Sequence, residues 1–463
     1  MVFGHSTQEA ETHAEHRLKL QKFPYSNPLQ TFLAISSVSD YCYILESAEG
    51  PRKLAQYSFI GFSPSKMIEA KNNQYTEHST HDTTTVTTDD PISRLRKNLA
   101  QNFTTYTGLR FVGGLVGYFS YDAIRYIESL PKKARDDLKL PDFQFGVYDD
   151  GIVFDHLTGQ AYYYWYRENR ISEIEKLLSR KPRNSSLTAS NLRVNIRQPE
   201  FIKMVEKAKN YIRAGDIFQV VLSKRFQFEI NGDLTNFYKT LREINPSPYM
   251  YFLKMKDTSL VGSSPEMLGR VSGRRVETFP IAGTCPIGRT HNETKRLASS
   301  LMNDPKERAE HVMLVDLARN DVGKVCNFGS VEVPDFMTIH KYSHVQHIVS
   351  RVTGELRRDH DAIDTFKSVF PAGTVSGAPK KRAMEIIDEL EPCRRGPYAG
   401  AIGYFSYNRN ADFAITIRTL IAKGKRAYVQ AGAGIVADSK PRREWSETEH
   451  KAKALLRALR LER

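Results

Sequence analysis

The sequence has few cysteines, and they are scattered. The chain of 463 residues contains four, Cys42, Cys285, Cys326 and Cys393, and no two of them have the C-x-x-C spacing of zinc or redox sites. Neither a disulfide framework nor a cysteine zinc site is therefore expected. This usage fits the reducing cytoplasm, where we predict the protein to reside.

The chain also lacks a long hydrophobic run. No segment approaches the roughly 18 consecutive apolar residues that a membrane-spanning helix needs. The N-terminal segment contains Glu9, Glu11 and Glu15 and no apolar centre, unlike a signal or transit peptide. We therefore predict a soluble protein that has no membrane partner.

Positive charge is abundant but not concentrated. Lys and Arg number 67 against 53 Asp and Glu, which gives a formal net charge of +14. Such a balance suits nucleic acid, an anionic membrane surface or small anionic substrates. The densest basic runs, such as that at residues 380–382, are short, which favours a solvated basic surface. No nucleic-acid partner is predicted.

Helical and β-like patterns interleave without the regular alternation of a doubly wound sheet. An amphipathic pattern predicts a helix over residues 200–214, and a β-like run follows over residues 217–230. Residues 413–420 alternate as one strand, and a turn at residues 423–425 returns the chain over residues 426–431 as a hairpin. The pattern predicts an α+β fold with large, mostly antiparallel sheets.

A polar stretch divides the chain into two regions. Residues 179–191 have the composition of a linker or a long surface loop, so we separate residues 20–178 from residues 192–460. The segments 114–121 and 400–407 are nearly the same sequence. Two glycine-rich strands at equivalent places of two β layers would explain this similarity, and chance is the alternative.

Two predicted helices each carry acidic side chains on one face. These are Glu307 and Glu310 in residues 304–321, and Glu444 and Glu447, followed by Lys451, in residues 442–456. Surface salt bridges are the plain explanation of such spacing. The functional explanation is a Mg²⁺ site, because this cation prefers carboxylate oxygens and keeps several waters.

Further segments have the composition of ligand-binding loops. Residues 370–379 are glycine-rich and lead into a predicted helix, whose N-terminus suits either an anion or a plain cap. Residues 430–434 are small and permit close approach of a ligand. The cluster of His340, His344 and His347 favours a single acid/base or orienting histidine over a zinc site.

Taken together, these segments resemble anthranilate synthase component I, within the family of chorismate-utilising enzymes. The resemblance covers most of the chain and is strongest between Tyr211 and Leu456. It implies large antiparallel sheets packed as a sandwich flanked by helices. The matching stretches are residues 212–223, 263–270, 279–284, 310–321, 342–352, 370–380, 412–419 and 430–434.

The resemblance implies a role for each matching position. Mg²⁺ would be the cofactor, held by Glu310 and Glu447. The residues expected to bind chorismate are Gly283, Thr284, Tyr398, Arg418, Gly432, Ala433, Gly434 and Lys451. The residues expected beside the reacting centre are Gln219, Glu266, His347 and Thr374. Glu266 is our candidate for the acid that protonates the departing hydroxyl, and its pKa should be raised if it is enclosed.

Two positions distinguish relatives within the family. Enzymes that use water as the nucleophile carry a lysine base where this chain has Gln219, and aminodeoxychorismate synthases typically carry a lysine where it has Ala282. Both residues favour ammonia as the nucleophile and anthranilate, with pyruvate, as the products, in tryptophan biosynthesis. Aminodeoxychorismate synthase component I, on the folate branch, stays open as the alternative, because some of these enzymes lack that lysine.

The resemblance also implies an inhibitor and a protein partner. Ser47, Pro248, Tyr249 and Met250 match the segments that hold L-tryptophan in feedback-inhibited members, and structural turns are the alternative explanation. No cysteine has the glycine-flanked context of a glutaminase nucleophile. Ammonia is therefore expected from solution or from a separate glutamine amidotransferase subunit, component II.

Overall fold

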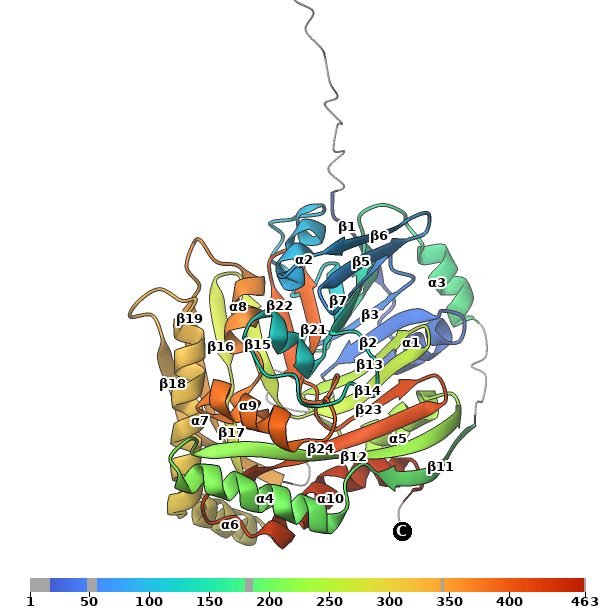
Figure 1. The fold of residues 1–463 in the computed structure, drawn as a ribbon. Helices are drawn as coiled ribbons and strands as arrows, with labels where there is room; N and C mark the ends of the chain where they lie inside the picture. The colour runs from blue at the N-terminus through green and yellow to red at the C-terminus, as the bar shows by residue number, and fades with distance from the viewer. Residues whose placement is uncertain (1–16, 48–55, 180–185, 343–344, 462–463) are drawn as a thin grey trace, which may run out of the picture.

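Two large antiparallel β-sheets form the framework of the protein (Figure 1). The computed structural model describes residues 17–47, 56–179, 186–342 and 345–461. Within these residues each sheet has twelve strands. Helices cover the sheets, and none of the described helices is long and apolar enough to cross a membrane. The predicted α+β fold with large antiparallel sheets is confirmed.

The first sheet combines strands from both halves of the chain. In spatial order its strands are β1 (Lys19–Phe23), β10 (Gln160–Trp165), β9 (Asp150–Asp155), β3 (Tyr57–Phe62), β2 (Tyr41–Glu46), β13 (Tyr249–Met255), β14 (Thr258–Ser264), β23 (Thr419–Lys423), β24 (Arg426–Ile435), β12 (Gln219–Gly232) and β11 (Leu187–Val194). The short strand β20 (Gly377–Ala378) also pairs with β12. The long strands β12 and β24 cross the lower part of the molecule in Figure 1.

The second sheet is built in the same way. In spatial order its strands are β17 (Ile281–Pro286), β19 (Val345–Glu355), β16 (Arg275–Thr278), β15 (Met267–Ser272), β22 (Ala411–Ile415), β21 (Ala401–Ser406), β7 (Gly114–Phe119), β8 (Phe143–Tyr148), β4 (Lys66–Lys71), β5 (Gln74–Ser79) and β6 (Thr83–Thr87), with β18 (Glu332–Lys341) paired to β19. Both predicted regions thus contribute strands to both sheets. The division into residues 20–178 and 192–460 stays a prediction.

The main hydrophobic core lies between the sheets. It joins side chains of the first sheet, such as Tyr43 and Phe59, to side chains of the second, such as Tyr148 and Tyr404. On the other face of the second sheet, Phe119 stacks on Phe366 of a covering helix with the ring centroids 4.1 Å apart, so this helix joins the same cluster. Burial of this much aromatic and aliphatic surface holds the two layers together.

Helices cover the outer faces of both sheets. The first sheet is covered by α1 (Pro28–Ser36), α3 (Ile171–Leu178), α5 (Thr235–Ile244) and α10 (Pro441–Ala458), and at its β12 end by α4 (Gln198–Arg213) and α9 (Lys380–Leu390). The second sheet contacts α2 (Pro91–Ala100), α6 (His291–Asn303), α7 (Pro305–Gly323) and α8 (Ala362–Val369). Two 3₁₀ turns, η1 (Tyr121–Tyr126) and η2 (Gly373–Val375), complete the described helices.

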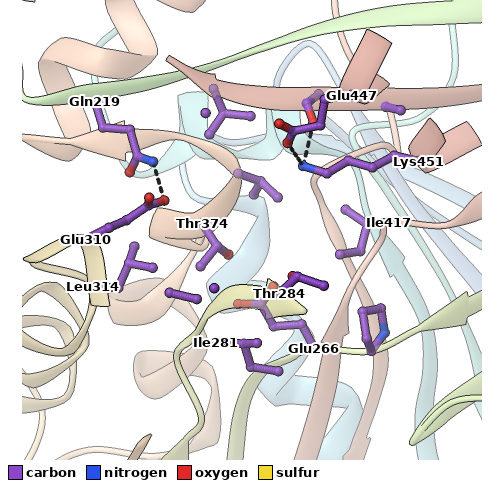
Figure 2. A pocket seen from close by; sticks show the side chains of 18 of the residues that line it. Gln219, Glu266, Ile281, Thr284, Glu310, Leu314, Thr374, Ile417, Glu447 and Lys451 are labelled. Atoms are coloured by element: carbon purple, nitrogen blue, oxygen red, sulfur yellow. Dashed lines mark hydrogen bonds and ion pairs between the residues drawn. The ribbon is translucent and has the colours of Figure 1, made fainter. Parts of the chain in front are cut away.

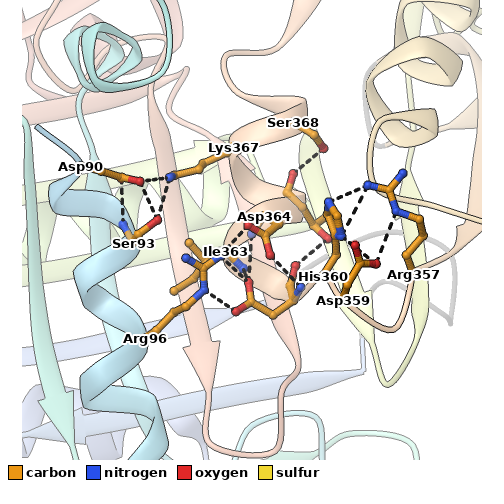
Figure 3. A network of polar contacts seen from close by, with 12 residues as sticks. Asp90, Ser93, Arg96, Arg357, Asp359, His360, Ile363, Asp364, Lys367 and Ser368 are labelled. Atoms are coloured by element: carbon orange, nitrogen blue, oxygen red, sulfur yellow. Dashed lines mark hydrogen bonds and ion pairs between the residues drawn. The ribbon is translucent and has the colours of Figure 1, made fainter.

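A polar network ties α2 from the first half of the chain to α8 from the second (Figure 3). Arg96 donates from Nε to Asp361 Oδ2 at 2.6 Å and also contacts Asp364. Lys367 donates from Nζ to Asp90 Oδ2 at 2.6 Å. Asp90 and Asp361 are also the N-caps of the two helices, so each carboxylate joins a helix start to a cross-chain contact.

The predicted helices are present, but one predicted strand and the predicted linker differ from the structure. The predicted strand over residues 413–420 is broken, because the chain leaves the second sheet after β22 and enters the first sheet at β23. The predicted linker is also partly a strand. Residues 187–194 form β11 on β12, while residues 180–185 lie outside the described residues.

The two similar segments do not occupy two different layers. They form β7 and β21, which are neighbours in the second sheet, with Gly117 opposite Gly403. A Cβ atom on Gly117 would lie 2.1 Å from the carbonyl oxygen of Gln144, and one on Gly403 would lie 2.0 Å from that of Asp412. The shared glycines therefore allow close approach of the neighbouring strands.

Candidate active site

A cavity of about 580 Å³ opens between α7, α10 and the ends of β12, β17 and β24 (Figure 2). This volume lies within the roughly 300–1,000 Å³ of small-molecule sites. The residues predicted from the sequence that line it are Gln219, Glu266, Gly283, Thr284, Glu310, His347, Thr374, Tyr398, Arg418, Gly432, Gly434, Glu447 and Lys451. Residues far apart in the sequence thus meet at one site.

Two carboxylates enter the cavity from different helices. Glu310 on α7 accepts a hydrogen bond from Gln219 Nε2 at 2.8 Å, and Glu447 on α10 pairs with Lys451 Nζ at 2.6 Å (Figure 2). The amide oxygen of Gln219 is buried and has no hydrogen-bond partner among the described residues. The cavity therefore holds anionic oxygens together with a free amide acceptor.

Two further carboxylates in the same wall are crowded by negative charge. Burial and the nearby Glu310 raise the pKa of Glu307, and burial and Glu447 raise the pKa of Glu444. A divalent cation would relieve this repulsion, and carboxylate oxygens suit Mg²⁺. No three His, Cys, Asp or Glu side chains in the described parts of the chain gather as in a closed metal site. Two carboxylates with open positions fit a cation that keeps water or substrate as ligands.

Arg418 lines the cavity and has a backbone conformation that is rare for residues other than glycine. It lies where the chain crosses from β22 to β23, and its φ of 51° is in the left-handed region that ordinary residues rarely adopt. Its carbonyl accepts from the Ser263 N–H at 3.1 Å, which holds the crossing in place. Within the described residues no hydrogen bond or ion pair engages the guanidinium, and burial lowers its pKa. A guanidinium without a partner suits a carboxylate, because its planar fork of donors can pair with both oxygens.

Glycines in β24 let two side chains lie against the strand. A Cβ atom on Gly432 would be 2.8 Å from the Tyr398 hydroxyl, and one on Gly434 would be 2.7 Å from Gln219 Nε2. The carbonyl of Gly432 also accepts from Lys451 Nζ at 3.0 Å. The small residues predicted as a ligand loop thus make room for side chains that line the cavity.

Glu266 is enclosed, as its proposed role requires. Burial raises the pKa of its carboxyl to about 8, while Thr374 and Lys451 oppose the rise. The Thr374 hydroxyl has no well-aligned partner among the described residues, although it lies near enough to Glu266 to affect that pKa. A carboxyl with such a pKa is protonated at neutral pH and can donate a proton.

His347 lies on β19 beside the bulge that displaces Gly283. Its Nδ1 is 3.0 Å from the Gly283 carbonyl oxygen and 3.1 Å from the Thr284 hydroxyl. Burial lowers the pKa of the imidazole, so it is neutral at pH 7. In the tautomer that carries its proton on Nδ1, the ring donates a hydrogen bond to the Gly283 carbonyl and Nε2 is free to accept one. Gly283 has a φ of 60°, and a Cβ atom there would be 3.0 Å from Glu307 Oε2.

The structure also locates three further features that were noted in the sequence. The side chain of Ala433 is buried in the core under α4 and α9, because neighbouring residues of a strand face opposite ways. The N-terminus of α9 does not line the cavity, and Lys380 pairs with Asp321. His340 and His347 face each other across β18 and β19 and share no helix, while His344 lies outside the described residues.

Comparison with known proteins identifies the family. The family described as chorismate binding enzyme matches residues 40–457. The chain belongs to this family. The anthranilate synthase component 1 of Methanothermobacter thermautotrophicus is 47% identical over 443 residues, which cover 95% of this chain and 94% of the relative.

Two further relatives show how the family divides. The aminodeoxychorismate synthase component 1 of Bacillus subtilis is 42% identical over 467 residues, covering 97% of this chain and 98% of that one. The crystal structure of anthranilate synthase component I from Streptococcus pneumoniae TIGR4 matches with a TM-score of 0.79 and 39% identity, covering 87% of this chain and 92% of that chain. Chorismate binding enzymes close to this chain thus include both kinds of synthase.

This chorismate binding enzyme has a second, much smaller cavity of about 40 Å³ between the two sheets. Ser47, Tyr249 and Met250, three of the residues expected to hold tryptophan, line it, whereas Pro248 is buried and does not. Tyr249 donates from its hydroxyl to Asp412 Oδ1 at 3.0 Å. The cavity has room for only a few water molecules as it stands.

Some residues of the main cavity in this chorismate binding enzyme were not assigned from the sequence. Lys306, Gln430 and His450 also line it. Lys306 precedes Glu307, and His450 lies three residues after Glu447, so helical spacing alone could have placed His450 at the site. The position of the Gln430 side chain could not be inferred from local spacing, because the pairing of β24 with β12 places it beside Ser223.

Proposed function

We propose that the chain is the large subunit of anthranilate synthase, which converts chorismate and ammonia to anthranilate, pyruvate and water in tryptophan biosynthesis. The observation that carries this proposal is the enclosed, unpaired guanidinium of Arg418 in the same cavity as Glu310 and Glu447. The similarity to anthranilate synthase component 1 over 95% of the chain supports it.

Chorismate is a dianion, and the proposal gives each carboxylate a partner. Arg418 pairs with one carboxylate through two parallel N–H donors, and the hydroxyl of Tyr398 lies on the same wall. We propose Mg²⁺ as the cofactor, held by Glu310 and Glu447. When bound, it would neutralise the other carboxylate of the substrate and take its remaining ligands from water.

The chemistry at the ring is assigned to Gln219 and Glu266. The free amide oxygen of Gln219 accepts an N–H of ammonia and directs the nitrogen lone pair at the ring. As the C–N bond forms, the ring C–O bond breaks, and Glu266 gives its proton to the departing hydroxyl to form water. Loss of a ring proton and of the enolpyruvyl group as pyruvate then gives the aromatic product.

Two residues favour anthranilate over 4-amino-4-deoxychorismate. Position 282 at the cavity wall is alanine and not the lysine nucleophile of many aminodeoxychorismate synthases. Position 219 is glutamine and not the lysine base that activates water in other relatives. The 42% identity with an aminodeoxychorismate synthase component 1 keeps that synthase as the second candidate.

Product analysis tests the proposal. The purified chain is mixed with chorismate, Mg²⁺ and ammonium, and the products are separated and quantified. Fluorescent anthranilate with an equal amount of pyruvate is the expected result. Accumulation of 4-amino-4-deoxychorismate would identify the chain as an aminodeoxychorismate synthase of the folate branch. If chorismate is not consumed, neither synthase activity is present.

The proposal extends to a partner, an inhibitor and a location. A glutamine amidotransferase subunit, component II, supplies ammonia, since none of the four cysteines lines the cavity. L-Tryptophan inhibits by binding at Ser47, Pro248, Tyr249 and Met250. The four cysteines are all buried and unpaired, which supports a location in the reducing cytoplasm.

A further inference from the structure

A buried ion pair behind the cavity has no part in the chemistry described above. The side chains of Arg395 and Glu391 are 1% and 3% exposed, and neither lines the cavity. Arg395 Nε donates to Glu391 Oε2 at 2.9 Å, and Nη2 donates to Oε1 at 2.6 Å. Replacing such a pair by apolar residues is often neutral for stability, so stability alone does not explain it.

The remaining donors of Arg395 reach two different walls of the cavity. Nη1 donates to the carbonyl of Val375 at 2.7 Å, and Nη2 donates to the carbonyl of Val221 at 2.7 Å. Val375 follows Thr374 in η2, whereas Val221 belongs to β12 two residues after Gln219. One guanidinium therefore fixes the segment of Thr374 relative to the strand of Gln219.

The ion pair also approaches a third part of the cavity lining, at Tyr398 and Gln430. The guanidinium of Arg395 lies 5.7 Å from the ring centroid of Tyr398 and 4.7 Å from that of Tyr121. Glu391 Oε1 accepts from both the N–H and the hydroxyl of Ser223 at 2.8 Å. Gln430 Nε2 in turn donates to the Ser223 hydroxyl at 2.8 Å, so a chain of contacts ends at a residue that lines the cavity.

We propose that Arg395 is a positioning residue, which holds Thr374, Gln219 and Tyr398 in register around the substrate. The inference rests on the function proposed above. A lysine keeps the charge but carries three N–H donors on one nitrogen, so it cannot reach the two carbonyls and both oxygens of Glu391 at once.

The test compares Arg395→Lys with Arg170→Lys. Arg170 is a matched control, because it makes the same kinds of contact far from the cavity. Its Nε donates to Asp150 Oδ2 at 3.0 Å, its Nη2 to the carbonyl of Phe62 at 3.0 Å, and it lies 4.2 Å from the Phe62 ring centroid. Both variants are purified, and circular dichroism verifies that they are folded before kinetics are measured.

The expected result for Arg395→Lys is a fall in kcat of about 100-fold, because misplacement by an ångström has effects of this size. KM for chorismate should rise about tenfold as Tyr398 shifts. The alkaline limb of the kcat profile should move to higher pH, since a displaced Thr374 no longer lowers the pKa of Glu266. Arg170→Lys should change none of the three.

A folded Arg395→Lys variant with wild-type kcat, KM and pH profile would overturn the inference, as would equal losses in both variants. If Arg395→Lys does not fold, Glu391→Gln replaces it, and unchanged kinetics there are equally decisive against the inference. A wild-type chain that does not form anthranilate contradicts the proposed function instead, so the two failures are distinguishable.

Discussion

At the scale of single residues, Glu310 and Glu447 differ in their partners. Glu310 is bonded to a neutral amide, whereas Glu447 is paired with the ammonium of Lys451. A cation that binds both carboxylates must compete with Lys451 at one of them only. If Glu447 is a ligand as proposed, its charge most directly sets the balance between the ammonium and the metal.

Glu447→Gln should raise the Mg²⁺ concentration for half-maximal activity by at least about tenfold, because one charged ligand becomes a weak neutral one. Folding should be unaffected, since the side chain is half-exposed. Mg²⁺ titration of anthranilate formation measures the change. Glu449→Gln is the control, as Glu449 lies on the same helix but pairs with Lys224. If both variants require the same Mg²⁺ concentration, Glu447 is not a ligand of the cation.

The pKa of Glu266 sets a direction for the dependence of activity on pH. Burial raises this pKa to about 8, so the carboxyl is protonated below that pH and loses its proton above it. Because the acid form is required, kcat should fall as pH rises through about 8, tenfold per pH unit. Glu266→Gln should lower kcat by about 10²–10⁴-fold and abolish this limb. The same alkaline limb in the variant would mean that another group is the acid.

At the scale of elements, β24 shows how a strand shapes a site through glycine. Gly432→Ala would place a methyl group 2.8 Å from the Tyr398 hydroxyl and displace that side chain. KM for chorismate should rise about tenfold, the equivalent of one lost contact of about 1.4 kcal/mol. Gly323→Ala at the end of α7 is the control, because nothing lies within 4 Å of its Cβ position. A wild-type KM for Gly432→Ala would show that Tyr398 does not contact the substrate.

The helices were the elements most open to prediction from sequence. The spacing of Glu307 with Glu310 and of Glu444 with Glu447 placed these side chains on α7 and α10, because helical periodicity is local. The crossing at Arg418 was not predictable in this way. Residues 413–420 alternate as a single strand, and only the sheet to which each half pairs reveals the break.

The same limit applies to the candidate site. The small residues at 430–434 were expected to end a hairpin and to allow close approach of a ligand, and the structure shows that they continue β24, with Gly432 and Gly434 at the cavity and Ala433 in the core. The network around Arg395 could not be predicted from the sequence either. Arg395 bonds the backbone carbonyls of Val221 and Val375, and every residue has such a carbonyl whatever its side chain.

At the scale of the whole molecule, the two cavities are linked by one segment of chain. Asp412, which lines the small cavity, lies on β22, and β22 leads directly into the crossing that presents Arg418 to the large cavity. Asp412 is fixed by Arg270 Nε at 2.7 Å and by the Tyr249 hydroxyl at 3.0 Å. A ligand that moves Tyr249 would therefore displace a strand that leads to Arg418, the proposed partner of a substrate carboxylate.

Tryptophan does not fit the small cavity without separating the strands around it, because the volume is about 40 Å³. Its binding energy would therefore be coupled to a change in how the two sheets pack, which would let the proposed inhibitor act on Arg418 at a distance. Ser47→Phe would place a bulky ring at the partly exposed edge of this cavity and block tryptophan from entering it. The tryptophan concentration for half inhibition should rise at least about tenfold, while kcat without tryptophan stays within about twofold of wild type.

Inhibition assays with and without tryptophan, at fixed chorismate, separate the two effects. Thr158→Phe serves as the control, since Thr158 is exposed in the turn between β9 and β10 and does not line the small cavity. Wild-type inhibition in Ser47→Phe would place tryptophan elsewhere. A large loss of basal turnover would instead mean that filling the small cavity by itself moves β22 and Arg418, so that the resting packing of the two sheets is already the active one.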